Sequence, residues 1–189
     1  SGLRGSARHL VHLRSEHTRI FSEQGSSTLS RAKSADFVKG ATLLNMDLAQ
    51  QIADQLLAME KEFTTSDPIN LHSGAKFIRE LASTNGQEQF LLDFYQGTIR
   101  LNKVTSNHRY ARTIILARLD LNGSPHMNPD GQVIHGSHLH LYREGYGDKW
   151  ASLLDATVFT DAADPALSLR QFLGFLNVQN IPAIQALLI

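Results

Sequence analysis

"ARTIILARLDLNGSPHMNPDGQVIHGSHLHLYRE", residues 111–144, contains two strand-like segments joined by a polar loop. The first segment, 111–121, is the most apolar of the strand-like runs, which favours a central strand of a sheet. The loop holds three glycines and two prolines, which are typical of turns. Residues 137–144 then return as a second strand, so we expect both segments in one antiparallel sheet.

Further strand-like segments precede this stretch, at residues 75–83, 87–95 and 98–104. Asn85-Gly86 between the first two is a strong hairpin signal, because both residue types tolerate the backbone angles of a tight turn. Gln96-Gly97 marks a second turn. Four or five consecutive strands with short connections predict an antiparallel meander.

Helical patterns lie on both sides of the predicted sheet. In residues 46–63, Leu48, Ile52, Leu56, Met59 and Phe63 share one helix face, and Asp47 can cap the helix. Residues 164–177 form a second amphipathic pattern, with Asp164 as the cap and Pro165 in the first turn. Residues 181–189 are expected as a short terminal helix or packed tail. The sequence therefore predicts an α+β fold with helices on one face of the sheet.

The composition limits the class of protein. The chain has 189 residues, of which 42% are hydrophobic and 19% charged, and no apolar run long enough to span a membrane. It has no cysteine and a net charge of zero, which excludes thiolate chemistry and does not favour bulk nucleic-acid binding. We expect a cytoplasmic protein with a basic Ser/Gly/Arg-rich extension at residues 1–45 and a single domain at residues 46–189.

Chemically active side chains gather in residues 138–151. Alternation along a strand places His138 and His140 on one face with Tyr142, opposite the two leucines between them. We expect the leucines to meet the core and the histidine face to be solvent-exposed or to line a groove. Arg118 and Asp120, at the end of the preceding strand, are expected to lie near His126 or near the second strand.

The leading interpretation of this cluster is acid–base catalysis on a phosphodiester without a metal or other cofactor. Histidines exchange protons near neutral pH, cations stabilise phosphoryl oxygens, and aromatic rings stack on bases. The predicted catalytic residues are His126, His138, His140, Arg118, Arg143 and Lys149, and the predicted substrate-binding residues are Tyr142, Tyr146, Trp150 and Asp120.

Two other interpretations stay open. His138-x-His140 on a strand presents two imidazoles to one side, and His126 or an acid could complete a metal site. Alternatively, the histidines are ordinary polar residues of a wet sheet face. The aromatic turn after them would then be structural, or would form an interface with another protein.

From Met46 onward the chain resembles a family of small, uncharacterised bacterial and prophage proteins. The resemblance rests on the segments "LLAMEKEF", "LDLNGSPHMNPDG", "HLHLYREGYGDKWA" and "FLGFLNV", and it implies no function. The layout is also similar to toxins of the RelE type from toxin–antitoxin modules. That similarity is carried by Arg118, Asp120, Pro125-His126 and His138-x-His140. It implies a small antiparallel sheet with helices on one face, RNA cleavage and a neutralising antitoxin.

Three functions are therefore considered. The first is a small cytoplasmic effector, a toxin-like endoribonuclease that acts on RNA and has an antitoxin as its partner. The second is a non-enzymatic phage or mobile-element protein that binds and inhibits a host protein. The third is a histidine-based, metal-dependent hydrolase.

Overall fold

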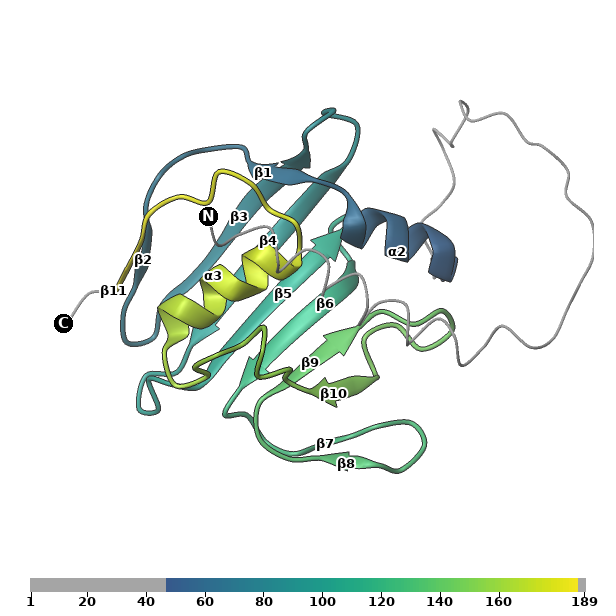
Figure 1. Cartoon of the computed structure of the whole chain (residues 1–189), viewed down its shortest axis with the longest axis vertical. Helices are drawn as coiled ribbons and strands as arrows, with labels where there is room; N and C mark the ends of the chain where they lie inside the picture. The colour runs from purple at the N-terminus through teal and green to yellow at the C-terminus, as the bar shows by residue number, and fades with distance from the viewer. Residues whose placement is uncertain (1–46, 187–189) are drawn as a thin grey trace, which may run out of the picture. The chain divides into compact units, whose positions relative to one another are not determined.

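A seven-stranded antiparallel sheet is the main element of the computed structural model, which describes residues 47–186 (Figure 1). The strand order is β1-β3-β4-β5-β6-β9-β10, so the middle of the sheet is a meander. The strands are β1 (Lys61–Phe63), β3 (Lys76–Ser83), β4 (Gln89–Gln96), β5 (Val104–Tyr110), β6 (Ile114–Leu121), β9 (His138–Leu141) and β10 (Ala151–Leu153). With two helices, this confirms the predicted α+β fold.

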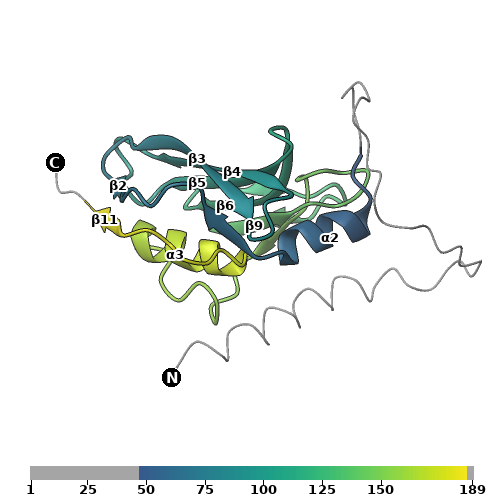
Figure 2. The same cartoon turned by 90° about the horizontal axis from the view of Figure 1, so that it is seen from above.

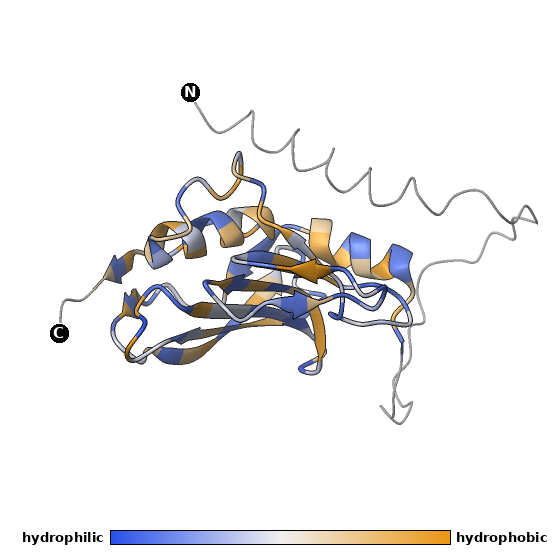
Figure 3. Ribbon diagram, turned by 90° about the horizontal axis from the view of Figure 1, so that it is seen from below, coloured by the Kyte–Doolittle hydropathy of each residue, from blue (hydrophilic) through white to orange (hydrophobic). Residues whose placement is uncertain are grey.

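Within the described residues two helices, α2 (Gln50–Ala58) and α3 (Pro165–Phe175), lie on the same side of the sheet (Figure 2). Leu169, Phe172 and Leu173 of α3 are buried, as are Leu92 and Leu119 of the sheet. Apolar burial of this kind is the main driving force of folding. Figure 3 shows hydrophobic and hydrophilic residues alternating along the strands, as expected of a sheet with one face on a core. No helix within residues 47–186 is long and apolar enough to cross a membrane.

The start of α3 agrees with the sequence. The Asp164 carboxylate accepts hydrogen bonds from the N–H groups of Ala166 and Leu167, and Pro165 occupies the first turn. The carboxylate satisfies two of the N–H groups that lack a partner at a helix start, and proline has no N–H group to leave unpaired. The first helix is shorter than predicted. It ends at Ala58 because residues 61–63 pair with residues 81–83 as a strand, and its cap position is Ala49 rather than Asp47.

We expect Asp164→Ala to lower the free energy of unfolding by about 1 kcal/mol, because two N–H groups of α3 lose their acceptor. Asp164→Asn should retain most of that stability, since an amide oxygen can accept the same bonds. Urea unfolding followed by far-UV circular dichroism measures both variants. Equal losses in the two variants would show that the cap bonds are not the cause.

One predicted strand is wrong. Residues 98–104 were expected as a strand, but residues 97–103 form a turn, in which Gly97 N–H donates to the Lys103 carbonyl at 2.9 Å. The strand is β5, at Val104–Tyr110. Its buried positions include Ser106 and His108, so the alternation of apolar residues that marks a half-buried strand is interrupted.

Short strands outside the main sheet complete the fold. β2 (Ile69–Leu71) pairs in parallel with β11 (Ile184–Ala186), so the end of the described chain is a strand and not a helix. Pro182 lies next to this strand and disfavours a continuous helix there. Residues expected as a polar loop contain the hairpin of β7 (His126–Met127) and β8 (Val133–Ile134). The predicted basic extension, residues 1–45, lies outside the described residues.

Candidate functional site

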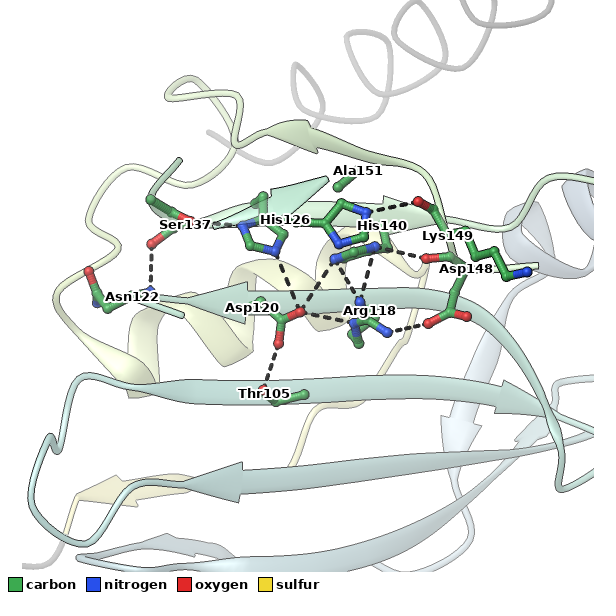
Figure 4. Close-up of polar contacts among 12 residues, drawn as sticks. Thr105, Arg118, Asp120, Asn122, His126, Ser137, His140, Asp148, Lys149 and Ala151 are labelled. Atoms are coloured by element: carbon green, nitrogen blue, oxygen red, sulfur yellow. Dashed lines mark hydrogen bonds and ion pairs between the residues drawn. The ribbon is translucent and has the colours of Figure 1, made fainter. Parts of the chain in front are cut away.

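The register of β6 and β9 brings the charged residues and histidines together. Asp120 lies directly opposite His138, and Arg118 lies opposite His140. On the other side of β6, Thr105 of β5 lies opposite Asp120. Residues directly opposite one another in adjacent strands project to the same face. We call the resulting group the histidine cluster: Arg118, Asp120, His126, His138 and His140. Figure 4 labels four of its members, Arg118, Asp120, His126 and His140.

The two histidines of β9 are buried, although we expected a face that is solvent-exposed or lines a groove. Their relative exposures are 2% for His138 and 0% for His140. His126 on β7 lies against both rings, at centroid distances of 5.8 Å and 4.5 Å. Asn128 holds this hairpin beside β10, because its side chain exchanges two hydrogen bonds with the backbone of Ala151. The covering hairpin is therefore part of the site.

Backbone carbonyls fix the orientation of both buried imidazoles. Nδ1 of His138 lies 2.8 Å from the Gly136 carbonyl oxygen, and Nδ1 of His140 lies 2.8 Å from the Asp148 carbonyl oxygen. Because a carbonyl only accepts, each Nδ1 carries the hydrogen and donates it. In the neutral ring the lone pair is then on Nε2. Both Nε2 atoms face Asp120.

The Asp120 carboxylate lies at the centre of the cluster. Its Oδ2 atom is 3.7 Å from His138 Nε2 and 3.4 Å from His140 Nε2, and its Oδ1 accepts from the Thr105 hydroxyl at 2.6 Å. Burial raises the pKa of Asp120, but the contact with His140, the hydrogen bond from Thr105 and the charge of Arg118 outweigh it, so the net shift is downward. The group is therefore a carboxylate at neutral pH.

Burial has the opposite consequence for His138. It lowers the pKa of the imidazole, and the hydrogen bond to Gly136 opposes this effect only in part. His138 is therefore neutral near pH 7, which is the protonation state that binds a metal ion.

Arg118 connects the cluster to Asp148. Its Nε donates to Asp120 Oδ2 at 2.9 Å, its Nη2 lies 2.9 Å from His140 Nε2, and its Nη1 pairs with the Asp148 carboxylate. Asp148 thus contacts the cluster twice, through its carbonyl and its carboxylate. Neither Asp148 nor Thr105 was predicted as a site residue. Asp148 follows a glycine-rich turn, and the sequence of that turn does not indicate that the chain folds back against β9.

The side chains of the remaining predicted residues make other contacts. The Tyr142 hydroxyl accepts from the Leu48 N–H at 2.7 Å and donates to the Leu48 carbonyl at 2.9 Å, so it anchors the segment before α2. The Arg143 guanidinium lies over the Trp150 ring at 4.1 Å, and Tyr146 contacts the same ring edge-on. Lys149 reaches the cluster through its backbone, whose carbonyl oxygen lies 2.8 Å from His126 Nε2.

Three ligand atoms in the cluster have the spacing of a metal site. One atom each from Asp120, His138 and His140 lies within 4.8 Å of the others. Bonds of about 2.0 Å to a tetrahedral zinc ion place neighbouring ligand atoms about 3.3 Å apart. The distances of 3.4 Å and 3.7 Å from Asp120 Oδ2 are close to that value. Two of the three ligand separations are therefore close to those of a small divalent-ion site, and the imidazole nitrogens lie within 4.8 Å of each other.

A family model described as a family of unknown function (DUF6978) matches residues 48–178. The chain belongs to this family. The match spans the whole histidine cluster, and it confirms the expected membership in an uncharacterised family. No curated protein and no solved structure matches the chain.

Proposed function

We propose that this protein is a metal-dependent hydrolase whose ion is held by Asp120, His138 and His140. One observation carries the proposal. Both buried imidazoles donate from Nδ1 to a backbone carbonyl and point Nε2 toward the same carboxylate oxygen, Oδ2 of Asp120. Metal-binding histidines usually make this second hydrogen bond, because it fixes the tautomer and the ring orientation.

The burial of the histidine pair favours this function over metal-free acid–base catalysis. A general acid or base must come within hydrogen-bond distance of the substrate. His140 is fully buried, and its Nε2 is already in contact with Arg118. A histidine that binds a metal ion, by contrast, has to contact only the ion and not the substrate. The metal-free interpretation is therefore the weaker of the two.

Three protein ligands leave a fourth position for water or substrate, as in catalytic zinc sites. An ion there would lower the pKa of its bound water and so supply a nucleophile at neutral pH. His126 is only half-buried and lies against His140, and we assign to it the role of taking a proton from that water. Asp120 and Arg118 are also partly exposed, with side-chain exposures of 17% and 25%, so the cluster is accessible from their side.

RNA is the first substrate to test. The similarity of layout to RelE-type toxins is carried by the same residues that form the histidine cluster, together with Pro125. On this proposal the protein is a toxin-like effector whose activity an antitoxin would neutralise.

We expect the full chain, made without a histidine tag and stripped with a chelator, to bind one zinc or manganese ion per molecule. The variant His138→Ala/His140→Ala should bind it at least 100-fold more weakly, because two of three ligands are lost. Isothermal titration calorimetry measures the affinity. RNA incubated with the metal-loaded wild type should be cleaved, and RNA incubated with the variant should not.

The matched control is His72→Ala/His135→Ala, which removes two histidines of the described chain outside the cluster. It should bind metal as the wild type does. Equal affinity in all three proteins would overturn the proposed ligand set. Metal binding without cleavage of any tested RNA would retain the metal centre and reject RNA as the substrate.

A further inference from the structure

Arg118 contacts the atoms that would bind a metal ion. Its Nε donates to Asp120 Oδ2 and its Nη2 to His140 Nε2, which are the ligand atoms of the proposed site. The lone pair of His140 Nε2 cannot accept a hydrogen bond and bind an ion at the same time. The contact with the Asp148 carboxylate does not involve a ligand atom, so it can persist.

We infer that the substrate carries a phosphate ester and that Arg118 binds its oxygens beside the metal ion. This inference rests on the proposed metal centre. With the ion in place, the guanidinium would stay paired with Asp148, and its Nη2 would lose His140 Nε2 as an acceptor. A guanidinium matches the oxygens of a phosphate with two parallel hydrogen bonds.

The charges around the ion favour an anionic ligand. The carboxylates of Asp120 and Asp148 offset the charge of a divalent cation, so the charge of Arg118 remains in excess. A phosphate oxygen could approach the ion beside its bound water, since catalytic zinc sites can expand to five ligands, while a second oxygen of the same group accepts from Arg118. During hydrolysis of a phosphate ester, the phosphoryl oxygens carry negative charge in the transition state. A guanidinium beside them stabilises that charge.

Other arginines of the same region are already engaged. Arg109 holds both carboxylate oxygens of Asp93 at 2.6 Å. Arg143 is stacked on Trp150. Arg118 is the arginine whose present contacts are with the ligand atoms themselves, and for this reason we assign the phosphate contact to it.

Titration of inorganic phosphate into the full chain tests this assignment. Metal occupancy is measured first in the wild type, Arg118→Gln, Arg118→Lys and the control Arg100→Gln, whose exposed arginine lies in the turn before β5. Phosphate should bind the metal-loaded wild type and Arg100→Gln equally. Arg118→Gln should bind it at least tenfold more weakly at equal metal occupancy. The phosphate affinity of Arg118→Lys should lie between these two, because lysine retains the positive charge but lacks the paired donors of a guanidinium.

Equal phosphate affinity in the wild type and both Arg118 variants, each loaded with metal, would overturn the inference and leave the metal centre standing. Acetate that binds the wild type as tightly as phosphate would also overturn it, because the site would then select any small anion. A wild-type protein that takes up no metal would instead reject the proposed function.

Discussion

Replacing Lys61 with methionine is expected to lower the free energy of unfolding by about 4 kcal/mol, because buried carbonyl groups lose a charged donor. Lys61 on β1 is fully buried, and its ammonium donates to the carbonyls of Leu57, Met59 and Leu176 at 3.1, 2.7 and 3.0 Å. These carbonyls lie at the C-terminal ends of α2 and α3, where helix carbonyls lack partners and the helix dipole is negative. Methionine fills similar volume and donates nothing.

Urea unfolding followed by Trp150 fluorescence measures this loss. Lys76→Met is the matched control, since Lys76 is an exposed lysine of the neighbouring strand β3. It should change the free energy of unfolding by less than about 0.5 kcal/mol. A similarly small change in Lys61→Met would show that water or backbone movement satisfies the carbonyls at both helix ends.

The sequence predicts those parts of the fold that depend on local pattern. Alternation along residues 138–141 places His138 and His140 on one face, and the structure has them there. Asp164 and Pro165 mark the start of α3 because capping is a matter of a few adjacent residues. The first helix pattern fails at its end, because the pairing of Lys61–Phe63 with β3 overrides the helical periodicity.

The surroundings of the site depend on contacts between distant segments. The burial of His140 needs the hairpin that carries His126, and this hairpin is held by Asn128 against β10. Asp148 reaches Arg118 after a turn in which Arg143 and Gly147 exchange two backbone hydrogen bonds of 2.8 Å. Periodicity assigns a residue to a face of its own strand, and it contains no information about what covers that face.

His108 on β5 shows the same limit, and it gives the second large prediction. Replacing it with leucine is expected to raise the free energy of unfolding by about 2 kcal/mol or more at pH 5. The ring is fully buried and stacks on Phe90 at 5.1 Å, and neither ring nitrogen has a hydrogen-bond partner among the described residues. Leucine would remove two buried polar atoms without leaving a large cavity.

The gain should depend on pH in a defined direction. Burial, and to a smaller extent the charge of Lys61, hold the pKa of His108 well below its ordinary value. Below about pH 6.5 the unfolded chain therefore binds a proton at this residue that the native protein does not bind. Each pH unit of acidification then costs the wild type about 1.4 kcal/mol, down to the native pKa. His108→Leu has no group that titrates at this position, so acidification does not reduce its free energy of unfolding in this way.

Urea unfolding of the wild type and His108→Leu at pH 7, 6 and 5, in the presence of a chelator, separates the two contributions. The stability difference at pH 7 reports mainly the unpartnered nitrogens, and its growth toward pH 5 reports the proton that only the unfolded chain binds. His135→Leu, at an exposed histidine, controls for the general effect of removing an imidazole and should show no such growth. A difference that stays constant from pH 7 to pH 5 would mean that native His108 takes up its proton as readily as the unfolded chain does. The buried His108 ring would then need a hydrogen-bond acceptor within the core, next to the strand pair β5–β6 that carries part of the histidine cluster.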